Sequence, residues 1–557
     1  MKKNLLLAFC LWSGTAVAQT TYLPLRTDEY HLLDRLQTLN GRLSNDFHSS
    51  IQPIPRKGAA TYLLRQRQDV NNRIAGMGSI DYYNTERALS ISGEWSETAD
   101  GDDGTLDSRK PILKCFYAKQ PDCIHVNNDD FFMVANPVVY LQAGSDSDMP
   151  GLRYISTRGM EARGRILDRL GFYTLIADNQ EKAQSYFYQW ANRYDAYPGF
   201  DYFTQNGSTM LDAFMARGYV DAGFAQEHIN VTFGYDKQFK GDGLRSMLLS
   251  DFAAPATFLR LRTQVGKLVY ENLYLQLTAA YQRSGGDRLL PRKYAALHHL
   301  SMNVLPRLNL GVFESTIFGG TNAFGAQYLI PIIGYNTVAR SLGADQKTSL
   351  GLNFKALPAR GVQVYGQLYA DGLNLGKISD SYWGNQYALQ LGLKYFDAFA
   401  LGNLDLQIEG NVVRPFTYSA NDGVEEYSHY NQPLAYQYGS GTVELTGLVQ
   451  YQPVKRMTIA AKGMYLKRGD ESSDPNSGTN IFAGQWHRMG DYGYGINGNG
   501  LANSNIYLNL NINYEARPNI FPEIGFNYLD QRTAGTASTY FYAGLRWNIA
   551  RRENDVF

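Results

Sequence analysis

The most regular pattern of hydrophobic and polar positions begins near residue 130 and repeats every two residues. In the stretch 259–265, Leu259, Leu261 and Val265 occupy one face, and the polar residues between them occupy the other. This alternation predicts a strand with one apolar and one polar side. Two arginines facing inward and leucines facing outward suit a membrane barrel, whose lipid face is apolar and whose lumen is polar.

The same alternation predicts an all-β transmembrane barrel of about 18 antiparallel strands, an even number as closed outer-membrane barrels require. The expected strands are 131–143, 153–166, 169–177, 212–225, 228–236, 256–269, 273–283, 294–304, 308–318, 347–357, 362–370, 385–396, 403–413, 441–452, 457–468, 504–515, 520–530 and 539–549.

The connections between these strands alternate between short and long. Short ones include 167–168, 226–227, 270–272, 305–307, 453–456 and 516–519, and long ones include 178–211, 319–346, 414–440 and 469–503. Outer-membrane barrels have short periplasmic turns and long external loops. With both termini in the periplasm, the long loops are expected outside the cell. Composition alone also permits a soluble β-sandwich, but a sandwich has no reason to sort its loops in this way.

The polar face of the strands predicts which side chains line the lumen. The candidates are Arg260, Arg262, Gln363, Gln367, Gln407, Glu409 and Asn411. Amides and aromatic rings bind neutral, hydroxyl-rich ligands through paired donors and acceptors and through ring stacking. Any barrel of this width also needs polar side chains to wet or plug its lumen, and the pattern does not separate these two explanations.

Residues 1–18 have the pattern of a secretory signal peptide. Lys2 and Lys3 precede a short apolar run, and Ala16-Val17-Ala18 forms a cleavage site. Residues 19–127 show helical spacing at 27–39, 57–75 and 81–91, which predicts a small, mainly helical periplasmic domain before a barrel at 128–557. A formal net charge of zero gives no electrostatic reason to expect nucleic acid as a partner.

The cysteines and the few charged motifs bear on chemistry. In an exported protein, Cys115 and Cys123 are expected to form a disulfide, with two free thiols as the alternative. Gly241-Asp242-Gly243 does not precede a helix in a βαβ unit, so it predicts no phosphate loop. His298 and His299 are adjacent and point to opposite strand faces, so they cannot share one metal. No catalytic site, metal site or cofactor is predicted, and an enzyme is disfavoured.

Several stretches resemble the Wzi-type capsule assembly family of outer-membrane proteins. They are the loop FGYDKQFKGDGLRSMLLSDFAAP at 233–255, residues 364–367 with Asp371, and residues 407–409 with 427–429 and 432–434. The order of a helical domain followed by a barrel resembles that family as well. Where its enterobacterial members carry tryptophans in the loop, this chain has Phe239. The insert 99–123 is similar to a branch of this family that occurs in gliding bacteria and is associated with gliding motility.

The resemblance implies a barrel of 18 strands that ties capsular polysaccharide to the outer membrane. The expected partners are outer-membrane lipid, extracellular polysaccharide and other envelope proteins. The ligand-binding candidates lie in loops expected outside: Lys240, Arg245, Tyr427, His429 and Gln432. The lysine and arginine could bind acidic sugars through charge-assisted hydrogen bonds. The alternatives are a gliding or secretion component that acts through protein partners, and a diffusion porin. A porin should have an open lumen, whereas a polysaccharide-binding barrel should be plugged.

Overall fold

The computed structural model describes residues 20–72, 76–96, 103–112, 115–167, 169–206, 209–225, 228–279, 290–319, 326–334, 346–471, 476–553 and 555–557. The predicted signal peptide lies outside the described residues.

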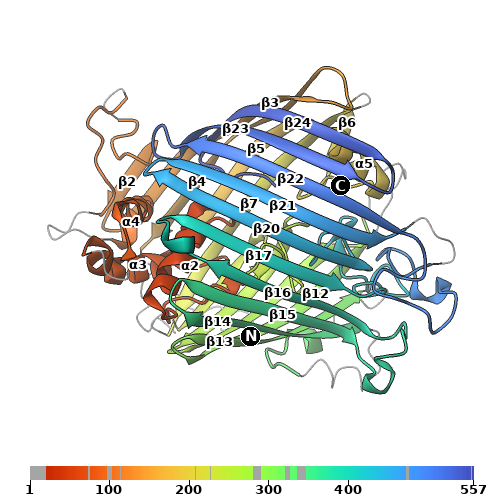
Figure 1. Cartoon of the computed structure of the whole chain (residues 1–557). Helices are drawn as coiled ribbons and strands as arrows, with labels where there is room; N and C mark the ends of the chain where they lie inside the picture. The colour runs from red at the N-terminus through yellow and green to blue at the C-terminus, as the bar shows by residue number, and fades with distance from the viewer. Residues whose placement is uncertain are drawn as a thin grey trace.

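Eighteen antiparallel strands close into a barrel, as predicted (Figure 1). The strands are β3 (Phe131–Asp146), β4 (Leu152–Ile166), β5 (Leu170–Lys182), β7 (Met210–Phe224), β8 (Ile229–Asp236), β10 (Ala256–Val265), β11 (Leu268–Thr278), β12 (Arg292–Leu305), β13 (Leu308–Gly319), β14 (Lys347–Ala359), β15 (Val362–Gly372), β16 (Gln386–Tyr395), β17 (Leu404–Val413), β20 (Thr442–Val454), β21 (Met457–Gly469), β22 (Ala502–Tyr514), β23 (Ile520–Gln531) and β24 (Thr536–Trp547). The last strand pairs with the first, with Trp547 opposite Val139. Closure leaves no unpaired sheet edge, which a bilayer would not tolerate.

The predicted turn at 270–272 is wrong. The chain turns at Gly266 and Lys267 instead, and β11 already runs through these three positions. Gly266 has a φ of 55°, a left-handed conformation that glycine adopts without strain. The charge of Glu271 made the segment look like a loop, but its carboxylate faces the interior and pairs with Lys240.

The outer surface of the wall is apolar. Large hydrophobic side chains alternate along the strands and remain exposed: Leu141, Met160, Ile176, Phe214, Phe233, Leu310, Val312, Leu350, Leu352, Leu389, Leu391, Leu393, Ile408, Leu445, Val449, Leu508, Leu510, Ile524 and Phe541. A belt of this kind is far larger than the apolar patches that soluble monomers expose. It is typical of a barrel whose outward face contacts lipid.

Three helices lie at the end of the barrel where the connections are short. They are α2 (Asp28–Asn40), α3 (Arg56–Asn71) and α4 (Ser79–Ile91), followed by the 3₁₀ turn η2 (Gly93–Trp95) (Figure 1). Leu32, Leu36 and Leu39 recur at helical spacing and are buried in a core that the helices share. Gly41 ends α2 in a left-handed conformation and donates to the carbonyls of the last turn.

The opposite end of the barrel carries the long connections. The first holds α5 (Ser185–Tyr194) and β6 (Phe203–Asn206), which pairs with β7. Others hold the 3₁₀ turns η3 (Ala326–Leu329), η4 (Leu375–Lys377) and η6 (Gln485–His487). Within the described ranges, no helix is both long and apolar enough to cross a membrane.

One long connection departs from the expected layout. In 319–346, predicted to lie outside the cell, the described residues 326–334 lie against the barrel wall. Tyr274 donates to the carbonyl of Leu329 over 2.8 Å, and Phe318 stacks on Tyr328 with ring centroids 3.7 Å apart.

Candidate functional site

The connection between β8 and β10 turns into the barrel and fills its lumen. Met247 and Leu248 are fully buried. The backbone N–H of Met247 donates to the Gln367 side chain over 2.7 Å, and that of Leu244 donates to Glu409 over 2.7 Å. These two acceptors belong to β15 and β17, on the wall. The connection therefore crosses the interior and is held by polar side chains of the wall strands.

A second connection, between β17 and β20, packs on the first. The hydroxyl of Tyr418 donates to the carbonyl of Met247 over 2.8 Å, and that of Tyr427 donates to the carbonyl of Leu248 over 2.7 Å. The Nε2 atom of His429 lies 3.0 Å from the carbonyl oxygen of Pro255. Tyrosine hydroxyls thus satisfy backbone carbonyls that the inward connection carries into the interior.

The N-terminal segment meets this filling inside the barrel. Ile51 and Gln52 form strand β1, which pairs with β9 (Phe239–Lys240) of the inward connection. The Lys240 ammonium lies 2.6 Å from Glu271 and donates to the carbonyl of Gln52 over 3.0 Å. Burial lowers the pKa of Lys240 to about 8, although Glu271 opposes this shift. A two-stranded ladder therefore joins the N-terminal segment, which enters at the helical end, to the inward connection, which enters at the opposite end.

The C-terminal tail also enters the lumen. Asp555 lies 2.6 Å from the Arg245 guanidinium and 2.6 Å from the Lys462 ammonium. The ring of Phe557 packs against Tyr438 and Tyr507, with centroids 5.5 Å and 5.8 Å apart. The sequence pattern did not reveal this tail, because ten residues beyond the last strand carry no periodicity. The tail, the inward connection and the wall together form one buried ion-pair network.

At the short-turn end, the helices are attached to the wall by ion pairs. Asp34 of α2 lies 2.6 Å from Lys355 and 2.5 Å from Lys394. Arg35 lies 2.7 Å from each of Asp405 and Asp397. Burial alone would raise the pKa of Asp34, but the two lysines outweigh it and hold this pKa well below its usual range.

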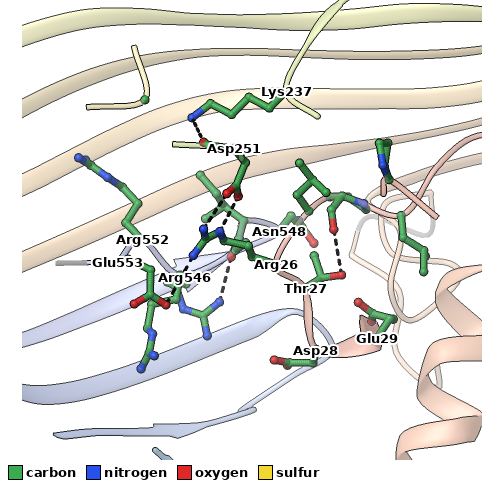
Figure 2. Close-up of a pocket in the computed structure, with 18 of the residues that line it drawn as sticks. Arg26, Thr27, Asp28, Glu29, Lys237, Asp251, Arg546, Asn548, Arg552 and Glu553 are labelled. Carbon is green, nitrogen blue, oxygen red and sulfur yellow. Dashed lines mark hydrogen bonds and ion pairs between the residues drawn. The ribbon is translucent and has the colours of Figure 1, made fainter. Parts of the chain in front are cut away.

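A chamber of about 470 Å³ remains between the N-terminal segment, the inward connection and the C-terminal tail. Figure 2 shows Arg26, Asp251, Arg546 and Arg552 around it. The Arg26 guanidinium forms a bidentate ion pair with the Asp251 carboxylate, with N···O distances of 2.5 Å and 2.6 Å. Arg546 pairs with Glu523 at 3.0 Å, and Arg552 with Glu181 at 2.9 Å. These internal pairs favour a structural role for the cations of the chamber.

Lys237 also lines the chamber, and its ammonium donates to the carbonyl of Asp251 over 2.9 Å. Burial, and then the positive charge of Arg217, lower the pKa of Lys237 to about 7. The lysine can therefore lose its proton near neutral pH without leaving the interior.

The five ligand-binding candidates lie in the filling and not on an exposed rim. Lys240, Arg245, Tyr427, His429 and Gln432 are all buried. Gln432 accepts from the N–H of Gly199 and donates to the carbonyl of Phe200, each over 2.8 Å. The loops predicted to lie outside turn inward at these positions, and each of the five side chains has partners within the protein. Their role in ligand binding stays a prediction.

The lumen-facing candidates contact the inward connection, the N-terminal segment with its helices, or neighbouring side chains of the wall. Arg260 lies over the ring of Tyr22, 4.1 Å from its centroid. Thr38 donates to the side chain of Gln363 over 3.1 Å. The remaining five are placed as follows: Arg262 is buried beside Gln264, Gln367 accepts from Met247, Gln407 donates to Tyr365, Glu409 accepts from Leu244, and Asn411 donates to Glu444.

The predicted disulfide is absent from this structure. Both cysteines are free, with Cys115 exposed and Cys123 half-buried. The backbone N–H of Tyr117 donates to the carbonyl of Cys123 over 3.0 Å. Burial, and then the nearby Cys123, raise the pKa of Tyr117. Cys115 and Cys123 therefore stay unlinked in this structure.

The fold and its interior define a class: a closed barrel of 18 strands, plugged by its own connections. The solved structure of Wzi, an outer-membrane protein involved in group 1 capsule assembly in Escherichia coli and described as a carbohydrate-binding β-barrel, is similar. Its TM-score is 0.53 at 13% identity, covering 96% of this chain and 100% of that chain. This likeness shows a shared fold.

Outer-membrane protein OprD of Pseudomonas aeruginosa matches with a TM-score of 0.41 at 11% identity, covering 74% of this chain and 94% of that chain. No protein-family model matches the sequence, and the comparison with curated proteins finds no match.

Proposed function

We propose that this protein is a non-enzymatic, Wzi-like outer-membrane barrel that binds or organises surface polysaccharide. The apolar belt supports a place in lipid, and the signal-peptide pattern supports export to the outer membrane of a Gram-negative cell. In this orientation the helices face the periplasm and the long connections face outward. The fold shared with a carbohydrate-binding barrel supports the class of ligand.

The observation that carries the proposal is the filled lumen. For example, Arg245 joins the inward connection to β20 through Glu444 and to the C-terminal tail through Asp555. A diffusion porin needs a continuous aqueous path, whereas this interior is bridged by buried contacts from wall to wall. The five candidates Lys240, Arg245, Tyr427, His429 and Gln432 serve the function indirectly, by holding the connections that carry the outer surface.

Deletion of the gene tests the function. The deletion strain is expected to shed polysaccharide into the medium while its synthesis continues, and a plasmid copy should restore the cell-bound fraction. Full retention of polysaccharide together with loss of surface spreading would instead favour the component that acts through protein partners.

Reconstitution into planar bilayers separates the polysaccharide-binding barrel from a porin. The purified full-length protein is expected to give no steady conductance. Steady ohmic channels from the intact protein would favour the porin.

A further inference from the structure

Two of the long connections together form an exposed aromatic surface. They are the residues 373–385, between β15 and β16, and the residues 476–501, before β22. Figure 1 shows the ends of these strands at the side of the barrel away from α2, α3 and α4. We define the aromatic platform as Tyr382, Trp383, Trp486, Arg488 and Tyr492.

Three of the four rings of the platform, those of Tyr382, Trp383 and Tyr492, are grouped, and Trp486 lies two residues before Arg488 in the same connection. Tyr382 lies between two neighbours, with centroids 5.6 Å from Tyr492 and 6.0 Å from Trp383. Trp486 is 63% exposed and Tyr492 is 54% exposed, so large parts of their surfaces face solvent. Exposed aromatic rings in a group are costly to hydrate and mark binding surfaces more often than scattered ones do.

Charged groups are placed beside the rings. The guanidinium of Arg488 lies 4.1 Å from the centroid of Trp383 and 3.2 Å from the Asp491 carboxylate. The ammonium of Lys377 lies 4.4 Å from the centroid of Tyr382. The surface therefore offers cationic donors and a carboxylate acceptor beside a group of tilted rings.

The backbone beneath the platform is held in place. The N–H of Trp383 donates to the carbonyl of Asp491, and the N–H of Tyr494 donates to that of Ser381, each over 3.0 Å. These two bonds join the two connections to each other. A platform whose parts are already joined loses little conformational freedom when it binds a ligand.

A buried arginine adds to this support. Arg414 donates to the carbonyls of Tyr382, Asn385 and Tyr494 over 3.2, 3.3 and 3.0 Å. The buried ring of Phe416 packs edge-on against Trp383 with centroids 5.9 Å apart. The side chains that support the rings thus come from the connection after β17, which also packs into the filled lumen.

We propose that the aromatic platform is the glycan-binding site of this protein. Sugar rings of a hydroxyl-rich polysaccharide would stack their C–H faces on Trp486 and Tyr492, while Arg488 donates to and Asp491 accepts from neighbouring hydroxyls. The proposal rests on the proposed function, since it names the surface through which polysaccharide binding occurs. The proposal thereby places the ligand on an accessible surface and not at the buried candidates Lys240, Arg245, Tyr427, His429 and Gln432.

The test measures binding of full-length protein in lipid nanodiscs to polysaccharide extracted from the surface of the cells that encode it. The double variant Trp486→Ala, Tyr492→Ala is expected to bind about tenfold more weakly or worse, because two stacking surfaces are lost. The double variant Trp486→Phe, Tyr492→Phe keeps a ring at each position and is expected to retain most of the binding. A heat-modifiable gel shift shows that each variant is folded.

Tyr202→Ala is the matched control, since Tyr202 is 62% exposed in another long connection and is not part of the platform. It should bind as the unchanged protein does. Binding by the unchanged protein with a less than twofold change in the alanine double variant overturns the platform and leaves the proposed function standing. An equal loss from Tyr202→Ala also overturns the platform. Failure of the unchanged protein to bind overturns both.

Discussion

The two ends of the barrel are closed by different chemistry. At the short-turn end, α2 is attached to the wall by charged groups, with Asp34 between two lysines and Arg35 between aspartates. At the long-loop end, the filling is largely apolar and aromatic. Its buried residues include Met247, Leu248, Tyr418, Tyr427 and Tyr436. The helices are therefore docked on the wall, whereas the inward connections form part of the barrel core.

This difference has an energetic consequence. Buried ion pairs contribute little beyond the cost of dehydrating them, but removing one partner leaves an uncompensated charge. The stabilisation from apolar packing falls in proportion to the apolar surface that a substitution exposes. Removal of one buried charge should therefore destabilise the protein strongly. Removal of one polar group from the aromatic filling should lower its stability only modestly. Arg245 and Lys240 are exceptions at the long-loop end, because each is a buried charge within the inward connection.

The largest effect is expected from Arg245→Ala. Glu444 and Asp555 would lose their shared cation, at a cost of about 3–5 kcal/mol. The measurement is the urea midpoint of the heat-modifiable gel shift. Adding Glu444→Gln should recover part of the loss, because Glu444 loses its ion pair with Arg245 whereas Asp555 keeps its pair with Lys462. An unchanged midpoint for Arg245→Ala would show that the filling does not depend on this network.

The next effect concerns the helical end. Asp34→Ala leaves Lys355 and Lys394 without their shared carboxylate and should weaken docking by about 2–5 kcal/mol. Limited proteolysis of residues 20–96 is expected to become faster while the barrel stays intact.

Arg65→Ala is its control, because the Arg65 pair with Asp46 is exposed and should contribute about 0–1 kcal/mol. Equal proteolysis rates in the two variants would contradict a docking that depends on buried charge.

A smaller effect is expected from Tyr427→Phe. This change removes the hydroxyl that satisfies the carbonyl of Leu248, at a cost of about 0.5–1.5 kcal/mol. Hydrogen exchange at the amides of the connection 237–255 should rise, without any change at the helical end. A rise at α2 of the same size would mean that the two ends are not independent.

The smallest effect is expected from mild acid. Burial lowers the pKa of His429 to about 4, so between about pH 4 and 6.5 the unfolded segment binds more protons than the folded one. Stability of the segment around His429 therefore falls as the pH drops through this window, by less than about 1 kcal/mol at pH 6. Hydrogen exchange corrected for intrinsic rates measures it, and His429→Gln should remove the dependence.

The barrel wall could be predicted from the sequence. Alternation such as that at 259–265 is a local property, and a strand that faces lipid on one side and polar groups on the other requires it. The predicted strands therefore lie within a few residues of the observed ones, except at 270–272, where the structure has strand β11 in place of the predicted turn. The helical spacing of Leu32, Leu36 and Leu39 was equally local, and the helices form where it occurs.

The course of the connections was decided only by the tertiary structure. Lys240 and Arg245 look alike in a sequence whether water or a carboxylate faces them, and their partners Glu271 and Asp555 lie far along the chain. The C-terminal tail and the pairing of Ile51 with Lys240 likewise depend on contacts that exist only once the wall has closed. The physical reason is that period-two alternation reports the environment on each side of a strand, whereas a polar loop has no such period and takes its environment from whatever the rest of the fold brings to it.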